Sequence, residues 1–308
     1  MKNYLEEIYN QYPTRKDEIE KERFRNYVIE EVSKSNYDVE IETIKKHNNV
    51  LIGDIQNAKI IFTAHYDTPA TSFIPNYMFP RNKGLWMISH FTFPISLGVL
   101  SYIFGYLITK QIEPLSLRIF LCIFIYLSLF FSSFYLSMFT FKNKHNKNDN
   151  TSGVSTILSL IEKNDSKDIA FVLFDNEEKG LLGSKAFNEK HKEILKDKFI
   201  INFDCVGIGE NVLIVVKDKA FKHDYYEYLK QSCVSNEYYH VLYFSNEEAR
   251  SNSDFRNFEC AIGVMTCECK NNIYYVDKIH TNKDKEANIN NIDFLVESFT
   301  KLIKNISQ

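Results

Sequence analysis

Short blocks of apolar residues alternate with mixed blocks along most of the chain. Runs rich in β-branched and aromatic residues predict strands, and apolar residues spaced three or four apart predict helices. The predicted strands are Val50–Ile55, Lys59–Ala64, Ile169–Phe174, Phe199–Phe203, Val212–Val216 and Ala261–Thr266. The predicted helices are Lys16–Ser33, Ser152–Lys163, Gly183–Lys196, Phe221–Ser232 and Ile289–Ile306. This alternation predicts an α/β fold, with a mixed, largely parallel β-sheet sandwiched between helices.

Two long blocks depart from this pattern because they carry no charged residue. They are Gly84–Thr109 and Ile119–Phe141, and a polar stretch with Glu113 and Pro114 separates them. A helix rises about 1.5 Å per residue, so each block is long enough to cross a hydrocarbon layer of roughly 30 Å. A pair of buried core helices is the alternative, but core helices rarely run this long without a polar face. We therefore expect a hairpin of two transmembrane helices.

The hairpin divides the predicted chain into two domains. Residues 84–141 form the inserted transmembrane hairpin, and residues 1–83 and 142–308 together form one discontinuous polar domain. The basic residues beside the two ends of the hairpin are Arg81, Lys83, Lys142, Lys144 and Lys147, whereas its turn offers Lys110 and Arg118. Loops rich in Lys and Arg stay on the cytoplasmic side of a membrane. We expect a cell-membrane protein with two spans, its polar domain and both termini in the cytoplasm, and lipid contact through residues 84–141.

Composition narrows the classes of function. The 308 residues include 37 Lys and Arg against 40 Asp and Glu, a formal net charge of -3. A nucleic-acid-binding protein normally shows a basic surplus, so no nucleic-acid partner is expected. Hydrophobic residues make up 44% and charged residues 25% of the chain, which excludes global disorder. The six cysteines form no CxxC pair, which favours reduced thiols in an intracellular compartment.

Acidic and histidine side chains gather where the predicted strands end. Ligand sites in open α/β sheets lie at the carboxyl ends of strands. Five such residues directly follow predicted strands, one stands before a predicted helix, and one lies in the loop before the last helix. In chain order the seven are His65, Asp67, Asp149, Glu177, Glu178, Asp204 and His280.

Each of these residues alone is more typical of a cap, a turn or a solvated surface group than of a ligand. Together, however, so many carboxylates and two imidazoles would crowd negative charge unless cations compensate it. Mixed histidine and carboxylate ligation suits zinc or a similar first-row ion. Two metals held a few ångströms apart need a bridging carboxylate, and this set has enough ligands for that.

Five motifs of the chain, HYDT, DNTSG, FDNEEKGLLGS, NFDCVG and IHTNKD, occur in the order seen in the co-catalytic zinc exopeptidase family, which they resemble. That family includes bacterial leucyl aminopeptidase, aminopeptidase Y, glutamate carboxypeptidase and, more remotely, glutaminyl cyclase. The resemblance spans roughly residues 59–285 and leaves out the hairpin. Residues 251–258, SNSDFRNF, resemble the family's Ser-Asp segment beside the substrate pocket, and packing in the core is an equal alternative for them.

The resemblance implies a role for each of the seven residues. The metal ligands would be His65, Asp149, Glu178, Asp204 and His280, holding two divalent metal ions, with Zn²⁺ as the expected ion. Asp149 would bridge both metals, and the family often holds the following peptide bond in cis. Asp67 would orient the imidazole of His65, and Glu177 would be the general base beside the metals.

These roles imply a membrane-anchored zinc metallopeptidase, an aminopeptidase that removes N-terminal residues from peptides by a metal-activated water. A glutaminyl cyclase-like activity with one zinc and a carboxypeptidase activity are the alternatives on the same fold. A non-catalytic scaffold would lack a ligand or the base, and here every position is filled. Both connections of the hairpin adjoin predicted ligands, so one expectation is a peptide substrate that is itself membrane-associated. The alternative is that the hairpin is a simple tether.

Overall fold

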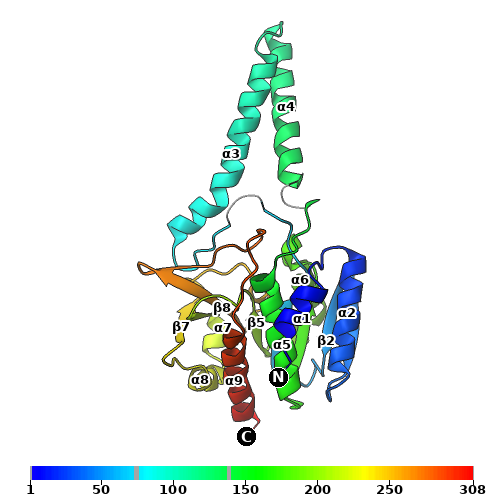
Figure 1. Ribbon diagram of the computed structural model, residues 1–308, viewed down its shortest axis with the longest axis vertical. Coiled ribbons are helices and arrows are strands. Elements are labelled where there is room, and N and C mark those ends of the chain that lie inside the picture. The colour runs from blue at the N-terminus through cyan, green and yellow to red at the C-terminus, as the bar shows by residue number, and fades with distance from the viewer. Residues whose placement is uncertain (1, 73–75, 137–139, 308) are drawn as a thin grey trace.

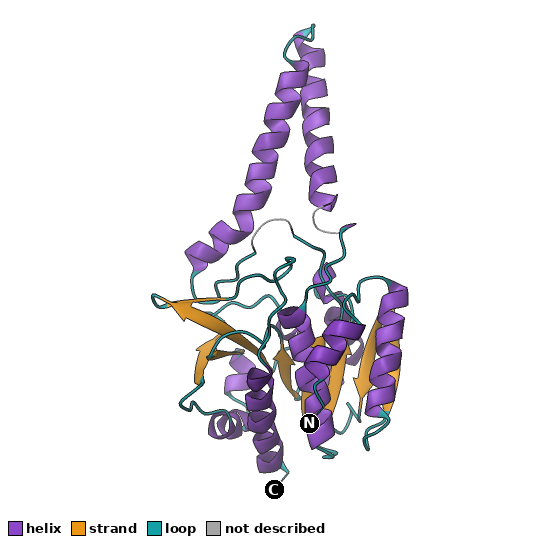
Figure 2. Ribbon diagram, viewed as in Figure 1, coloured by secondary structure: helices purple, strands orange, loops and turns teal. Residues whose placement is uncertain are grey.

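Helices cover both faces of a mixed β-sheet in the computed structural model, which describes residues 2–72, 76–136 and 140–307 (Figures 1 and 2). Ile60 and Phe62 pack into one apolar cluster, whereas Ile61 between them packs into a second cluster on the opposite face. Neighbouring strand residues point to opposite faces, so a strand covered on both sides is apolar throughout. The expected mixed α/β fold with helices flanking the sheet is confirmed.

The described residues form a nine-stranded sheet in the order β1-β2-β4-β3-β5-β8-β6-β7, with β9 beside β8. The strands are β1 Val39–Ile44, β2 His47–Ile52, β3 Ile60–His65, β4 Ile169–Phe174, β5 Phe199–Phe203, β6 Asn211–Val216, β7 His240–Ser245, β8 Ala261–Lys270 and β9 Ile273–Tyr275. The four central strands β4, β3, β5 and β8 run parallel to one another. All six predicted strands are present with somewhat shifted ends, and β1, β7 and β9 were not predicted.

The helices fall on the two faces of this sheet. The first apolar cluster joins α1 Tyr4–Gln11, α2 Glu18–Val32, α5 Gly153–Lys163, α8 Tyr225–Ser232 and α9 Ile289–Ile306, while α6 Leu182–Leu195 packs into the second. Four of the five helices predicted outside the hairpin are confirmed in outline. The predicted Phe221–Ser232 helix is instead divided between α8 and the short α7 Asp218–Phe221, and α1 was not predicted.

Aromatic rings dominate the centre of the first cluster. The ring of Phe62 stacks on Phe171 and Phe203, with centroids 5.7 and 6.1 Å away, and meets Phe299 of α9 edge-on at 5.9 Å. All four side chains are fully buried. Truncating one buried Phe to Ala typically costs about 3–5 kcal/mol, so this group fixes α9 against the middle of the sheet.

The two apolar blocks form a helical hairpin that projects from one end of the body, away from the C-terminus (Figure 1). Its helices are α3 Lys83–Thr109 and α4 Leu115–Tyr135, and both are long and apolar enough to cross a membrane. They pack closely at Gly105, where an added Cβ would lie 3.1 Å from the carbonyl oxygen of Cys122. The second predicted block reaches Phe141, but residues 137–139 lie outside the described part.

The two legs of the hairpin are bonded to each other and to the body. The Thr71 N–H donates to the carbonyl of Phe141 at 2.7 Å, and Ala70 pairs with Lys142 in an antiparallel bridge. The Nδ2 of Asn143 donates to the carbonyl of Thr281 at 3.1 Å. These bonds tie the base of the hairpin to the loop that follows β9.

Candidate metal centre

The carboxyl ends of the parallel strands face the base of the hairpin, and the predicted site residues gather there. His65 is the last residue of β3, and Asp204 directly follows β5. Glu177 and Glu178 open the short helix η3 Glu177–Lys179 after β4. Asp149 lies in the irregular helix η2 Lys147–Ser152 ahead of α5, and His280 lies in the loop before α9.

Asp149 stands between the two histidines. Its Oδ1 lies 3.3 Å from Nε2 of His65, and its Oδ2 lies 3.0 Å from Nε2 of His280. Asp149 and Asn150 depart from helical dihedrals, and the peptide bond that joins them is cis, as the resemblance leads one to expect. One carboxylate therefore faces two imidazoles with separate oxygens, which is the arrangement that a bridging ligand requires.

Two groups of candidate ligands share Asp149. His65, Asp149 and Asp204 place one donor atom each within 4.8 Å of one another, and so do Asp149, Glu178 and His280. A third such group joins His65 with Glu177 and Glu178. The structure thus brings all the predicted ligands and the predicted base into one cluster, and their roles in binding and catalysis stay predictions.

Asp67 organises the neighbours of the cluster. Its Oδ1 lies 3.5 Å from Nδ1 of His65, on the ring edge opposite Asp149. The same carboxylate accepts the backbone N–H groups of Glu177 at 2.9 Å and Glu178 at 3.2 Å. Asp67 is therefore placed to orient both the His65 ring and the turn that carries the two glutamates.

Left-handed backbone conformations lie at or next to three of these residues. Asn176, Cys205 and His280 have φ of 56°, 57° and 57°. Non-glycine residues seldom adopt such angles, and they persist where the surrounding structure over-determines them. Near Glu177, the N-terminal end of α6 packs so closely that a Cβ on Gly183 would overlap the carbonyl oxygen of Asp175. The tight packing fixes the direction in which the glutamate side chains leave the chain.

Burial and mutual charge shift the pKa values of the innermost groups. Burial alone would lower the pKa of His65, but neighbouring carboxylates, chiefly Glu177, raise it well above its ordinary value. Burial would raise the pKa of Asp149, but hydrogen bonds with His280 and His65 hold it well below its usual range. Asp67 likewise has a lowered pKa, because its partner His65 outweighs the effect of burial. These three side chains are 1–6% exposed.

The glutamates shift in the opposite direction. Burial raises the pKa of Glu177 well above its ordinary value, and the charges of Glu178 and Asp254 add to that rise. Burial also raises the pKa of Glu178 to about 8. A carboxylate crowded by others releases its proton more readily once cations are present.

The donor set fits divalent cations. Among the described residues, the Oε1 of Glu178 is buried without a hydrogen-bond partner, although the other oxygen lies 3.4 Å from Nε2 of His280. A buried carboxylate oxygen without a donor is unfavourable unless a ligand satisfies it. Imidazole nitrogens and carboxylate oxygens are ligands that zinc and similar ions accept. The residues could therefore hold two metals that share Asp149.

Two further acids near the cluster had no assigned role in the sequence analysis. Asp284 accepts the N–H groups of Asn148 and Asp149 at 2.9 and 3.0 Å, and burial raises its pKa to about 8. Asp254 is fully buried, accepts the Ser184 hydroxyl at 2.5 Å, and has a pKa raised to about 7 by burial. Asp254 falls within the Ser-Asp segment that the resemblance marked, whereas Asp284 shows a signal only by its place in the IHTNKD motif.

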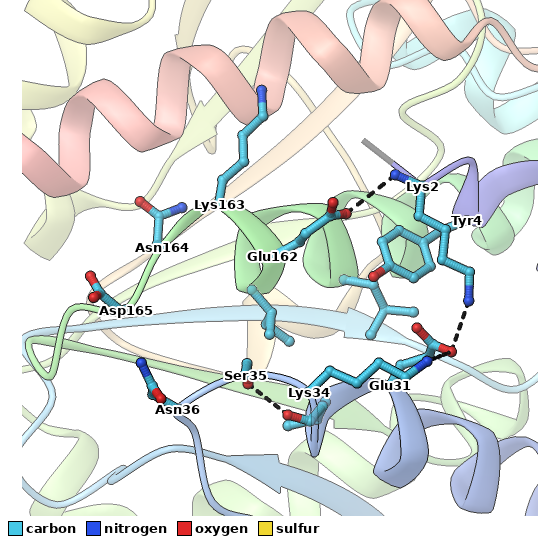
Figure 3. Close-up of a pocket in the computed structure, with 13 residues that line it drawn as sticks. Lys2, Tyr4, Glu31, Lys34, Ser35, Asn36, Glu162, Lys163, Asn164 and Asp165 are labelled. Carbon is cyan, nitrogen blue, oxygen red and sulfur yellow. Dashed lines mark hydrogen bonds and ion pairs between the residues drawn. The ribbon is translucent and has the colours of Figure 1, made fainter.

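A separate hollow of about 590 Å³ lies apart from the cluster, and Figure 3 labels residues that line it. It opens between the first residues of α1, the end of α2 and the end of α5, close to the amino end of β4. Within it, Lys2 and Lys34 are both bonded to Glu31, at 2.8 and 2.6 Å. Its described lining includes none of the candidate ligands, so this hollow is not part of the metal centre.

Comparison with known proteins agrees with the fold and the donor set. Residues 140–296 match the sequence profile of Peptidase family M28. No curated protein matches the chain. The Legionella pneumophila LapA aminopeptidase is similar in structure, with 14% identity, a TM-score of 0.58, and 98% of this chain aligned to 70% of that one.

Two other solved structures are similar at the same level. The glutaminyl cyclase of Fimbriiglobus ruber shares 11% identity over 98% of this chain and 92% of its own, with a TM-score of 0.57. LapB from Legionella pneumophila shares 11% identity over 98% of this chain and 70% of its own, with a TM-score of 0.56. At these identities the likeness establishes the fold. The family match begins where the chain returns from the hairpin, and it includes Asp149, Glu177, Glu178, Asp204 and His280.

Proposed function

This chain belongs to peptidase family M28 and is a metallopeptidase, and from that membership we propose that it is a membrane-anchored, two-zinc aminopeptidase. The observation that carries the proposal is the position of Asp149. One of its carboxylate oxygens faces His65 and the other faces His280. A single-metal enzyme needs no carboxylate in that position. Two metals a few ångströms apart do need one.

Five residues would hold the two metals. His65 and Asp204 would bind the first, Glu178 and His280 the second, and Asp149 both. When bound, the metals would supply a polarised water near neutral pH and a Lewis acid for the scissile carbonyl.

Glu177 would move the proton. Its carboxylate groups with His65 and Glu178 rather than with Asp149, so it is near the ligands without sharing the bridging position. It would accept the proton of the attacking water and later deliver it to the leaving amine. Asp67 would act on the same step by holding the Glu177 backbone N–H at 2.9 Å and orienting the His65 imidazole.

An assay of purified full-length protein tests the activity. Peptides with a free N-terminus, an acetylated N-terminus or an N-terminal Gln are offered, and the metal content of the same sample is counted by mass spectrometry. We expect hydrolysis of the free peptides, no hydrolysis of the acetylated ones, and two metals per chain. Pyroglutamate as the product with one metal would instead identify a glutaminyl cyclase, and removal of C-terminal residues would identify a carboxypeptidase.

The hairpin would anchor the protein in the bilayer. In the proposed division, residues 84–141 form the transmembrane insert, and residues 1–83 and 142–308 form the metallopeptidase domain. Exposed apolar side chains such as Leu100, Phe120 and Phe131 are 62–65% accessible, and a bilayer would cover them. The basic residues at the hairpin base would keep the domain and both termini in the cytoplasm.

The substrate would be a peptide held at the same membrane surface. The hairpin leaves the body after Asp67 and returns before Asp149, so both legs flank the candidate ligands. The Ser72 N–H donates to the carbonyl of His280 at 2.6 Å, which brings one leg against the metal centre. A peptide anchored in the bilayer with its N-terminus in the cytoplasm would therefore reach the site directly.

A rate comparison in vesicles tests this choice of substrate. The full-length protein is reconstituted, and the same peptide is offered either free in solution or attached to lipid at its C-terminus. We expect faster turnover of the anchored peptide. Equal rates for both, also after the hairpin is replaced by a short Gly-Ser linker, would indicate that the hairpin is only a tether.

A further inference from the structure

A fully buried arginine lies behind the metal centre. Arg15 belongs to the segment between α1 and α2, and its side chain has no exposed surface. Buried arginines are rare, since the desolvated charge must be matched by hydrogen bonds or by opposite charge. Its guanidinium carbon lies 5.1 Å from the ring centroid of Phe24, a residue of the first apolar cluster.

One side of Arg15 brackets the turn that carries His65 and Asp67. Its Nε donates to the carbonyl of Tyr66 at 2.6 Å, and its backbone N–H donates to Oγ1 of Thr68 at 2.9 Å. In return, the Thr68 N–H donates to the Arg15 carbonyl at 3.2 Å. The peptide units on both sides of Asp67 are therefore bonded to this one residue.

The other side of Arg15 reaches the segment that carries Asp149. Its Nη2 donates to Oδ1 of Asn146 at 3.3 Å and to Oγ1 of Thr151 at 3.1 Å. Thr151 also donates its hydroxyl to Asn146 at 2.8 Å, so the two acceptors form one unit across η2. A planar guanidinium offers donors in a fixed fork, which sets the spacing of the groups that it joins.

Among the described residues, Arg15 is near the acids Asp67 and Asp149 but forms no ion pair with a carboxylate. The described acceptors of its guanidinium, on Tyr12, Tyr66, Asn146 and Thr151, are all uncharged oxygens. Burial lowers the pKa of Arg15 to about 10, and the charges of Asp67 and Asp149 oppose that fall. The guanidinium therefore stays protonated at neutral pH.

A count of the formal charges in the cluster indicates a role for the positive charge of Arg15. With all of them ionised, the carboxylates of the cluster bring five negative charges, from Asp67, Asp149, Glu177, Glu178 and Asp204. Two divalent cations bring four positive charges. One negative charge remains even before the buried acids Asp254 and Asp284 are counted, and Arg15 is a fully buried cation beside these carboxylates.

We propose that Arg15 is a positioning residue of the metal centre, which holds the His65–Asp67 turn and the Asp149 segment at ligating distance and balances their remaining charge. The proposal rests on the proposed two-metal site. Residues 2–33 lie outside the stretch that matches the family profile, so the metal centre depends on a part of the chain that the profile does not describe.

Zinc affinity of full-length Arg15 variants tests the proposal. Zinc is titrated into the metal-free protein against a chelator of known affinity, and the folded fraction is followed by thermal unfolding. Supporting partners of metal ligands typically change affinity by about 10–100-fold, so Arg15→Gln should raise the zinc Kd by that factor. Arg15→Lys keeps the charge but loses the fork, and an intermediate Kd is expected.

Two control variants separate positioning from general stability. Val28 is a fully buried apolar residue of α2, and Val28→Ala should lower the unfolding temperature while the zinc Kd stays unchanged. Arg23 is exposed on the same helix, and Arg23→Gln should change neither quantity.

The outcomes distinguish the two-metal site from the role of Arg15. A wild-type protein that binds fewer than two zinc ions would overturn the proposed function. Two ions in the wild type, together with a zinc Kd for Arg15→Gln within twofold of wild type, would overturn the positioning role alone.

Discussion

The metal centre and the hairpin both depart from the usual rule that charged residues are exposed and apolar residues are buried, and they do so in opposite ways. At the metal centre, His65, Asp67 and Asp149 are buried although charged groups normally stay in water. Along α3 and α4, side chains such as Leu100 and Phe120 are exposed although apolar groups normally leave water. The first region concentrates negative charge away from water, and the second presents apolar side chains at its surface. Both arrangements are unfavourable for a protein in water alone.

Hydrogen bonds join these two regions. The hydrogen bonds from Ser72 to His280 and from Asn143 to Thr281 connect the hairpin legs to the loop that carries a candidate ligand. Lys142, at the second leg, pairs with Glu20 at 2.7 Å and with Asp17, both beside the start of α2. The bilayer and the metals would consequently act on neighbouring parts of one structure.

Metal removal should produce the largest effect and should affect one region alone. Dialysis of the protein against a chelator is expected to abolish peptidase activity and to lower the unfolding free energy of the body. A ligand present at a thousand times its Kd stabilises the folded state by about 4 kcal/mol. Thermal unfolding with and without added zinc measures the loss.

The hairpin is the internal control for this experiment. Its helicity in vesicles should not respond to the chelator, because no candidate ligand lies on α3 or α4. Full activity after complete metal removal would refute the proposal that the buried acids bind metal ions.

Substitution of the proposed base should separate catalysis from metal binding. Glu177→Gln keeps the size of the side chain and removes its proton acceptor. A positioned general base contributes about 10²–10⁴-fold to the rate, so kcat should fall by that factor while two metals remain bound. Steady-state kinetics and metal counting on one sample measure both quantities. Glu193→Gln, at an exposed position of α6, should leave kcat unchanged. A near wild-type kcat for the Glu177 variant would mean that another group accepts the proton.

A single charge should reveal the depth of the hairpin in the bilayer. Leu127 lies near the middle of α4 and is 42% exposed. Arginine at a helix centre costs about 2.5–3.5 kcal/mol for membrane insertion, so Leu127→Arg should shift part of the protein into the carbonate-extractable fraction. Leu117→Arg, near the start of the same helix, should have a much smaller effect, because the long side chain reaches the interface. Identical extraction of both variants would argue against a membrane-spanning α4.

The smallest expected effect concerns the link between the regions. Asn143→Ala removes the bond to the carbonyl of Thr281 and should reduce stability by about 1 kcal/mol. Hydrogen exchange should then increase at the loop around His280 and not in α9. As a control, Asn57→Ala removes the side-chain bond to Asp54 at an exposed turn and should leave that loop unaffected. An unchanged exchange pattern in the Asn143 variant would show that the hairpin does not stabilise the ligand loop.

The central strands could be predicted because their burial leaves a continuous apolar run in the sequence. The hairpin could be predicted for another reason: its two blocks are apolar over lengths that could cross a membrane. β3, β4 and β5 are buried along their whole length. β1 reads VEIETI, in which Glu40 and Thr43 are exposed and the other residues are half-buried, so it shows no strict alternation and its strand character depends on pairing with β2. The three-residue β9 carries no pattern of its own and exists through its pairing with β8. α1 has a usable signal, an Asn3 cap ahead of buried Leu5 and Ile8, which was not recognised.

The candidate ligands could be predicted because strand ends place them by a general rule, independent of side-chain detail. Arg15 could not be predicted in this way. In the sequence it stands in a run of charged residues that resembles a solvated surface. Its burial follows from contacts with remote residues, the carbonyl of Tyr66, the hydroxyl of Thr151 and the ring of Phe24. Asp284 was likewise hidden, since the N–H groups that donate to it belong to Asn148 and Asp149 of η2, far away in the chain.

The sequence by itself determined the classes of element, the two apolar blocks, and the supply of imidazoles and carboxylates, because each of these is a local property of composition and spacing. Only the tertiary structure decided that Asp149 faces His65 with one oxygen and His280 with the other, and that Arg15 lies behind them. Those distances depend on how β3, η2 and the loop before α9 pack together. Side chains from remote segments meet at fixed separations only when the whole core is formed.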